Sequence, residues 1–92
     1  DMVNVANTAV DRFGRIDILV QNAGIYPTAL LRDMTEQDWD DVCDTNLKGS
    51  FLALKAVLPV MEKQAYGRIV MMSSITGPKV TQPGFAHYAA SK

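Results

Sequence analysis

The sequence predicts an α/β fold with parallel strands. Two short segments rich in apolar residues, 16–20 and 68–73, are typical of buried strands. Apolar residues at helical spacing precede the first segment and fill the interval between the two. Because a long helix that connects two strands of one sheet must cross over between them, we expect the strands to be parallel.

The first third of the chain predicts a helix, a strand and a loop. One apolar stripe at helical spacing marks the helix, and its members are Met2, Val3, Ala6, Ala9, Val10 and Phe13. Gly14 follows directly, as a helix-ending glycine does. Residues 16–20 are mostly apolar and mostly β-branched, which predicts a strand buried on both faces. Residues 21–34 form a loop, with Gly24 and Pro27 as breakers.

The remainder predicts a long helix, a second strand and the start of a last helix. Thr35 is an expected N-cap, with Asp38 reaching back in a capping box. The helix continues to about Tyr66, with a kink at Pro59 because proline lacks the backbone donor. Residues 68–73 form the second strand and residues 74–85 another loop. The last helix begins near Ala86.

Composition excludes several classes of partner. The chain has 92 residues, 48% of them hydrophobic, and a net charge of −1. This balance gives no electrostatic reason to expect nucleic acid or anionic lipid. The longest apolar stretch, residues 56–61, is too short to span a membrane. A single cysteine, Cys43, fits a reducing cytoplasmic location. We expect no metal site.

The end of the chain carries a candidate acid/base pair. Tyr88 and Lys92 are four residues apart, so on a helix they share one face. A phenol has a pKa of about 10, and lowering it by ~3 units requires roughly 4 kcal/mol. One ammonium at ~4 Å supplies about that much at an effective dielectric constant near 20. The spacing predicts a tuned tyrosine acid/base, although the same pattern also arises by chance in helices without catalytic function.

Three further blocks precede this pair in the sequence. The first strand runs into Asn22, Ala23 and Gly24, the long helix contains Asn46, and the second strand ends at Ser73 and Ser74. Ligands of open parallel sheets bind beyond the carboxyl ends of the strands, where the first and third blocks lie. Ordinary turn residues are the alternative interpretation of the serine pair.

The order and spacing of the four blocks resemble the short-chain dehydrogenase/reductase family over essentially the whole chain. The resemblance implies a Rossmann-like, doubly wound parallel sheet of which only the central helix-strand-helix-strand part is present. Residues 1–92 are then part of a single NAD(P)-binding domain that is incomplete at both ends. A glycine-rich phosphate turn is implied upstream, with further strands and helices downstream.

The resemblance also implies catalytic roles. Ser74 hydrogen-bonds the substrate oxygen, and Tyr88 exchanges a proton with that oxygen while NAD or NADP exchanges a hydride with the carbon. Lys92 lowers the tyrosine pKa and holds the nicotinamide ribose. Asn46 uses its side chain or backbone carbonyl to hold a water that connects Lys92 to solvent. A solvent-facing helix asparagine is the alternative for Asn46.

Cofactor contacts are implied for the turn after the first strand. Asn22, Ala23 and Gly24 are similar to the family's Asn-Asn-Ala-Gly turn, which lies along the cofactor, with Gln21 in place of the first asparagine. Gly24 allows close approach of its backbone to the ligand. For His87 we expect an exposed or pocket-rim position, because neighbouring helix residues do not share the face of Tyr88.

Two function classes stay open. The first is an NAD(P)-dependent oxidoreductase acting on a small-molecule alcohol or carbonyl, and the second is a non-catalytic fragment that keeps the fold as a binding or assembly module. We expect a homodimer or homotetramer of the full-length protein, and no activity of the 92 residues alone. The apolar stripe expected to serve both sheet and partner consists of Leu47, Phe51, Leu54 and Leu58.

Overall fold

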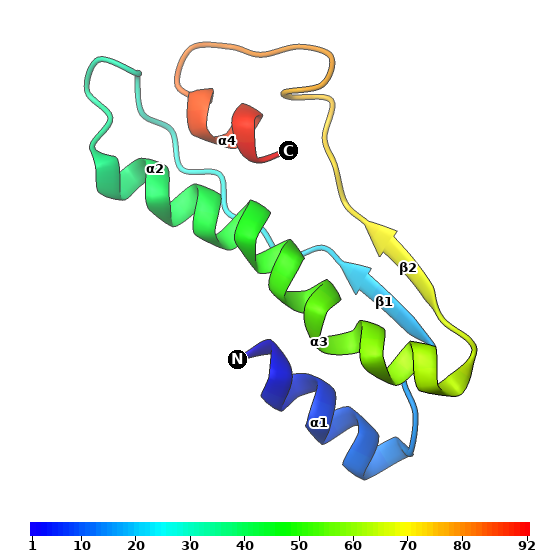
Figure 1. Cartoon of the computed structure of the whole chain (residues 1–92). Coiled ribbons are helices and arrows are strands. Elements are labelled where there is room, and N and C mark those ends of the chain that lie inside the picture. Colours follow the sequence, from blue (N-terminus) through cyan, green and yellow to red (C-terminus); the bar gives the residue numbers. More distant parts are fainter. The chain divides into compact units, whose positions relative to one another are not determined.

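The computed structural model describes all 92 residues. The elements follow the predicted order of helix, strand, long helical stretch, strand and helix (Figure 1). They are α1 (Met2–Phe13), β1 (Ile18–Gln21), α2 (Glu36–Cys43), the π-helical η1 (Asp44–Lys48), α3 (Gly49–Gln64), β2 (Arg68–Met71) and α4 (Ala86–Ser91). The chain forms two compact units, a first unit of Asp1–Asn22 and Ser50–Met72 and a second unit of Ala23–Gly49 and Ser73–Lys92.

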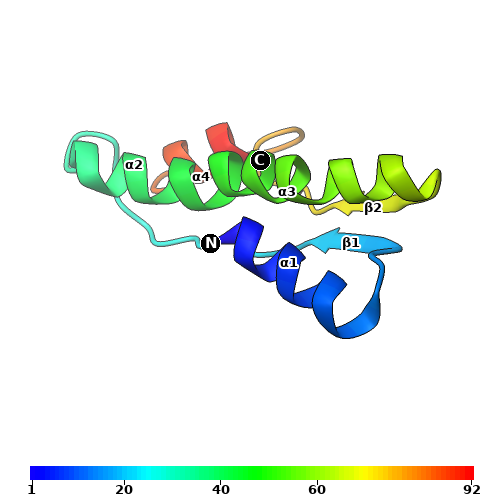
Figure 2. The same cartoon turned by 60° about the horizontal axis from the view of Figure 1, so that its bottom comes forward.

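The first unit packs two helices against a two-stranded parallel sheet. β1 and β2 pair in register from Ile18↔Arg68 to Gln21↔Met71, which confirms the parallel prediction. The helix α1 begins at the N-cap Asp1 and ends at Gly14, whose φ of 80° is the left-handed conformation that glycine adopts without strain. Figures 1 and 2 show α1 beside α3, and the core between them and β1 consists of Ala6, Val57 and Met61 with Ile16, Leu19 and Ala56.

Burial of the first strand on both faces was a wrong prediction for these 92 residues. Leu19 is half-buried against the core, but its neighbours Ile18 and Val20 are 63% and 55% exposed. Successive strand residues point to opposite faces, so the face of Ile18 and Val20 is open. The physical reason is that α1 and α3 both pack on the Leu19 face and no other element of this unit covers the opposite one.

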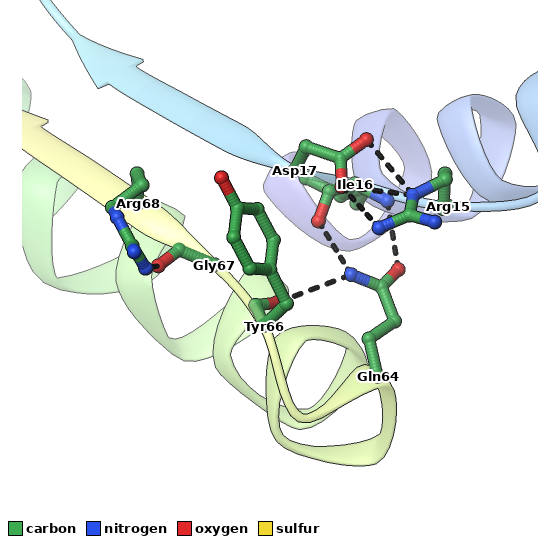
Figure 3. Close-up of polar contacts among 7 residues, drawn as sticks. All are labelled: Arg15, Ile16, Asp17, Gln64, Tyr66, Gly67 and Arg68. Carbon is green, nitrogen blue, oxygen red and sulfur yellow. Dashed lines mark hydrogen bonds and ion pairs between the residues drawn. The ribbon is translucent and has the colours of Figure 1, made fainter.

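A side-chain amide joins the end of α3 to the start of β1 (Figure 3). The backbone N–H of Ile16 donates to Gln64 Oε1 at 2.9 Å, and Gln64 Nε2 donates to the Ile16 carbonyl at 2.8 Å. Gln64 Nε2 also reaches the carbonyl of Tyr66 at 3.3 Å. One amide therefore satisfies backbone groups that the two-stranded sheet leaves unpaired.

The second unit packs α2 and η1 against α4. The predicted capping box is confirmed: Asp38 N–H donates to Thr35 Oγ1 at 3.1 Å, and Thr35 N–H donates to Asp38 Oδ2 at 2.9 Å. Val42 of α2 and His87 of α4 are both fully buried. The two long loops of this unit meet where the Ala29 N–H donates to the Gly84 carbonyl at 3.1 Å.

The long helical stretch departs from a regular α-helix at η1. Pro59 lies inside α3, which continues to Gln64, so the proline does not start a separate element. In η1 the Gly49 N–H bonds the carbonyl of Asp44, five residues back. Such single π-turns change the direction of side chains along a helix and are frequent at functional sites. Here the altered turn contains Asn46.

Candidate functional site

The helix α4 presents two pairs of residues at i, i+4 spacing. Tyr88 and Lys92 form a half-buried pair, and the Lys92 Nζ lies 6.0 Å from the centre of the Tyr88 ring. The ring of Phe85 packs edge-on against Tyr88 at 5.9 Å. His87 and Ser91 form the second pair, and both are buried. His87 and Ser91 thus lie on the face of the helix that packs into the second unit. The adjacent face carries the phenol of Tyr88 and the ammonium of Lys92.

Gly24 lies against Asn46 and Lys92. A Cβ placed on Gly24 would be 3.2 Å from Asn46 Oδ1 and 3.5 Å from Lys92 Nζ. Gly24 is itself exposed, so its backbone is accessible beside the ammonium. The turn after β1, the π-segment and the end of α4 therefore meet at this glycine, which brings together three of the residues predicted from sequence.

Asn46 is 3% exposed, so the alternative of a solvent-facing asparagine is wrong. Its Oδ1 accepts from the Ile25 N–H at 2.8 Å, and its Nδ2 donates to the Ile25 carbonyl at 2.9 Å and to Ser91 Oγ at 3.0 Å. Ser91 Oγ donates onward to the Tyr88 carbonyl at 2.8 Å. The side chain therefore connects the loop after Gly24 with the helix of Tyr88.

Ser74 belongs to a loop that runs along α4. Ser73 Oγ donates to the Lys92 carbonyl at 3.2 Å, which places the start of the loop at the end of the helix. At the other end, a Cβ on Gly77 would be 2.6 Å from the Ala89 carbonyl oxygen, so Gly77 lies against the helix beside Tyr88. Ser74 lies between these two contacts and is half-buried, and its Oγ accepts from the Thr76 N–H at 3.1 Å. That bond leaves the serine hydroxyl hydrogen free to donate.

Comparison with known proteins identifies the family. The family model described as short chain dehydrogenase matches residues 1–92. This chain belongs to the short-chain dehydrogenase family. The resemblance predicted from the motifs is thereby confirmed.

The relatives and a solved structure agree with the family assignment. The chain is 49% identical over 83 residues to the 3-oxoacyl-[acyl-carrier-protein] reductase FabG of Staphylococcus epidermidis, covering 90% of this chain and 34% of that protein. It is 50% identical over 88 residues to the FabG of Thermotoga maritima, covering 96% and 35%, and 54% identical over 79 residues to the oxidoreductase UcpA of Salmonella typhimurium, covering 86% and 30%. A crystal structure assigned to the short-chain dehydrogenase/reductases, from Burkholderia xenovorans, matches with a TM-score of 0.91 at 37% identity.

The solved structure also confirms the Rossmann-like α/β fold class. The match covers 99% of this chain and 36% of that chain. This short-chain dehydrogenase chain thus spans about a third of the length of the relatives it matches.

The predicted cofactor residue Asn22 and the neighbour of Tyr88, His87, complete the description of the short-chain dehydrogenase site. Asn22 is exposed and belongs to the first unit, whereas Ala23, Gly24 and the four candidate catalytic residues belong to the second. His87 is fully buried, so its predicted exposed or rim position is wrong. The helical rotation that separates it from the Tyr88 face turns it toward α2 instead. No local pattern in the sequence signals this burial, because it depends on the packing of α4 against α2.

Two titratable groups of α2 in this short-chain dehydrogenase chain have shifted pKa values. The backbone and side-chain hydrogen bonds with Thr35 lower the pKa of Asp38, and nearby His87 adds a smaller effect in the same direction. Burial raises the pKa of the Cys43 thiol, and the charges of Asp40 and Asp44 add to this. No group of three His, Cys, Asp or Glu side chains is placed to hold a metal ion, and none of the helices has the length and hydropathy to span a bilayer.

Proposed function

We propose that this chain carries the catalytic part of an oxidoreductase that transfers a hydride between NAD or NADP and an alcohol or carbonyl substrate. The observation that carries the proposal is the meeting of Gly24, Asn46 and Lys92, with Tyr88 on the same helical face as Lys92. Such an arrangement puts an ammonium beside both a phenol and an accessible backbone turn. This is a suitable environment for moving one proton next to a bound ligand.

Tyr88 is the proposed acid and base. In the reducing direction its phenol gives a proton to the substrate oxygen, and in the oxidising direction the phenolate takes that proton back. The nearby Lys92 ammonium stabilises the phenolate electrostatically. Ser74 donates its free hydroxyl hydrogen to the same substrate oxygen, which orients the substrate and stabilises developing negative charge.

The residues around Gly24 fit a nicotinamide cofactor. A side chain at position 24 would fill the space beside Lys92 Nζ, so glycine keeps this surface open to a ligand. Lys92 would hold the ribose hydroxyls of this cofactor, and Asn22, Ala23 and Gly24 would contribute the turn that contacts it. When bound, the nicotinamide supplies or accepts the hydride.

Asn46 is proposed to hold, through its side chain or backbone carbonyl, a water that connects Lys92 to solvent. Its side-chain amide is hydrogen-bonded to Ile25 and Ser91. Its place in the π-helical turn beside Gly24 and Lys92 supports this role. The side chain then positions the loop of Gly24.

Substitution of Tyr88 tests the proposal in the full-length protein. Y88F removes the proton donor and should lower kcat by about 10²–10⁴-fold, while NADH or NADPH still binds. The matched control is Y66F, because the exposed Tyr66 lies in the first unit, against Arg68. Near-normal turnover of Y88F would overturn the assignment. Wild-type protein that binds neither NADH nor NADPH would favour the alternative of a non-catalytic binding or assembly module.

The names of the relatives differ in the substrate that they give. Among the relatives, FabG is named a reductase of 3-oxoacyl-[acyl-carrier-protein], whereas UcpA is named only an oxidoreductase.

We further propose a cytoplasmic protein that forms a homodimer or homotetramer. Exposed apolar side chains on the long helical stretch support the assembly, with Leu47 and Phe51 each 57% exposed and Leu58 41% exposed. A monomer by light scattering would contradict it.

A further inference from the structure

Both backbone polar groups of Tyr88 are hydrogen-bonded to buried side chains. The Tyr88 N–H donates to Nδ1 of His87 at 2.9 Å. The Tyr88 carbonyl accepts from Ser91 Oγ at 2.8 Å, in addition to the helical bond from the Lys92 N–H at 3.1 Å. His87 is 0% exposed and Ser91 is 6% exposed. The residue proposed as acid and base is therefore held at its backbone from both sides.

The N–H of Tyr88 needs such a partner because α4 has no conventional cap. The first N–H groups of a helix lack intrahelical acceptors, and a polar N-cap side chain usually supplies one. The N-cap here is Phe85, which makes no side-chain capping bond. The imidazole of His87, inside the first turn, takes over this function for the residue that follows it.

The contact between His87 and the Tyr88 N–H has a cost in free energy at the other ring nitrogen of His87. An Nδ1 that accepts carries no hydrogen, so in the neutral ring the hydrogen is on Nε2. Nε2 is buried and has no hydrogen-bond partner. An unpaired buried N–H costs about 1–3 kcal/mol, which an apolar side chain of similar size would avoid. Packing between α2 and α4 alone therefore does not explain a histidine at this position.

We propose that His87 is a positioning residue for Tyr88. By accepting the Tyr88 N–H, it fixes the first turn of α4 and so the direction in which the phenol leaves the helix, with Ser91 holding the other end of the same residue. This rests on the proposed role of Tyr88 as acid and base. Loss of the acceptor lets the turn fray, and the phenol then departs from the position at which it reaches the substrate oxygen.

A matched pair of variants in the full-length protein separates positioning from packing. Asparagine and leucine have nearly the same shape, but only asparagine offers an oxygen close to the place of Nδ1. H87L should lower kcat about 10- to 100-fold with the KM for NADH or NADPH nearly unchanged. H87N should keep kcat within about threefold of wild type, because the Tyr88 N–H regains an acceptor. Both should lose similar thermal stability, since both lose the ring.

Equal losses of kcat in H87N and H87L, or unchanged kcat in both, would overturn the proposal. If H87L does not fold, H87M takes its place as a variant of adequate volume without an oxygen or nitrogen acceptor. NMR with 15N-labelled histidine gives a second readout on the wild-type protein, and the His87 signal is assigned by its absence in H87N. Hydrogen on Nε2 is expected, and hydrogen on Nδ1 would overturn the contact. Absence of any NAD(P)H-dependent turnover in wild type would reject the proposed function, while the NMR result still decides the His87 contact.

Discussion

The side-chain amide of Asn46 pairs with the backbone of Ile25 through two hydrogen bonds, one in each direction. The Ile25 N–H donates to Oδ1 at 2.8 Å, and Nδ2 donates to the Ile25 carbonyl at 2.9 Å. This imitates the pairing of two extended backbones and holds the loop directly after Gly24. Because Nδ2 also reaches Ser91, one buried amide links the proposed cofactor turn to the helix of Tyr88.

The first prediction concerns this amide. N46D replaces the donor Nδ2 by an oxygen that faces the Ile25 carbonyl and Ser91 Oγ. We expect it to reduce the free energy of unfolding of the full-length protein by about 2–4 kcal/mol, because a buried charge then lacks its partners. Chemical denaturation measures the loss. The control is N7D on the exposed part of α1, expected within about 0.5 kcal/mol of wild type. Similar effects of the two substitutions would contradict the importance of the Asn46 contacts.

More of the fold than of the candidate site could be predicted from the sequence. Periodicity and the capping box of Thr35 and Asp38 are local signals, so the element order and the start of the long helix were predicted correctly. The π-helical turn at Asn46 was not, because no local spacing of residues distinguishes it from an α-helical turn. The contact of Asn46 with Ile25 joins residues 21 positions apart, which local signals do not describe. Burial of His87 likewise results from packing of α4 against α2, which no local pattern describes.

The second prediction compares two glycines of positive φ. Gly77 has a φ of 112° and lies where a Cβ would be 2.6 Å from the Ala89 carbonyl oxygen, whereas Gly14 has a φ of 80° and no atom within 4 Å of such a Cβ. G14A should cost about 1–2 kcal/mol from backbone strain alone. G77A should cost more and should also lower kcat, because the loop of Ser74 is pushed away from α4.

Thermal unfolding and steady-state kinetics of both glycine variants provide the measurement. Normal kcat in G77A would show that the loop of Ser74 does not need its contact with α4. A loss of kcat in G14A as large as that in G77A would show that the effect is not specific to this loop.

The third prediction concerns acid stability of the capping box. Hydrogen bonds with Thr35 lower the pKa of Asp38 in the folded protein. A lowered folded pKa stabilises the fold at pH values above the unfolded pKa of about 4, and this contribution disappears as pH falls through the lower folded value. The stability difference between wild type and D38A should therefore be largest near neutral pH and shrink below about pH 4. D40A is the control, since Asp40 is not part of the capping box, and an equal pH dependence in both variants would contradict the role of the capping box.

The last prediction concerns the 92 residues expressed alone. The sheet has two strands, so each strand has one unpaired edge. On one face of the sheet the apolar side chains are open to solvent, with Ile18 63%, Val20 55% and Val70 47% exposed. Open apolar strands of this kind pair with other copies, so we expect poor solubility and no dehydrogenase activity of the isolated chain.

Variants of β1 test whether this open face is the cause. I18T/V20T makes the open face polar and should raise the soluble fraction after expression, because threonine keeps the strand propensity. L19T changes the opposite face, which packs on Ala6, Val57 and Met61. This variant should not raise the soluble fraction. An equal gain from both variants would reject the open face as the cause. A cooperative thermal transition of the unmodified chain, together with measurable NAD(P)H oxidation, would overturn the prediction as a whole, because it would show that these residues suffice for both the fold and the chemistry.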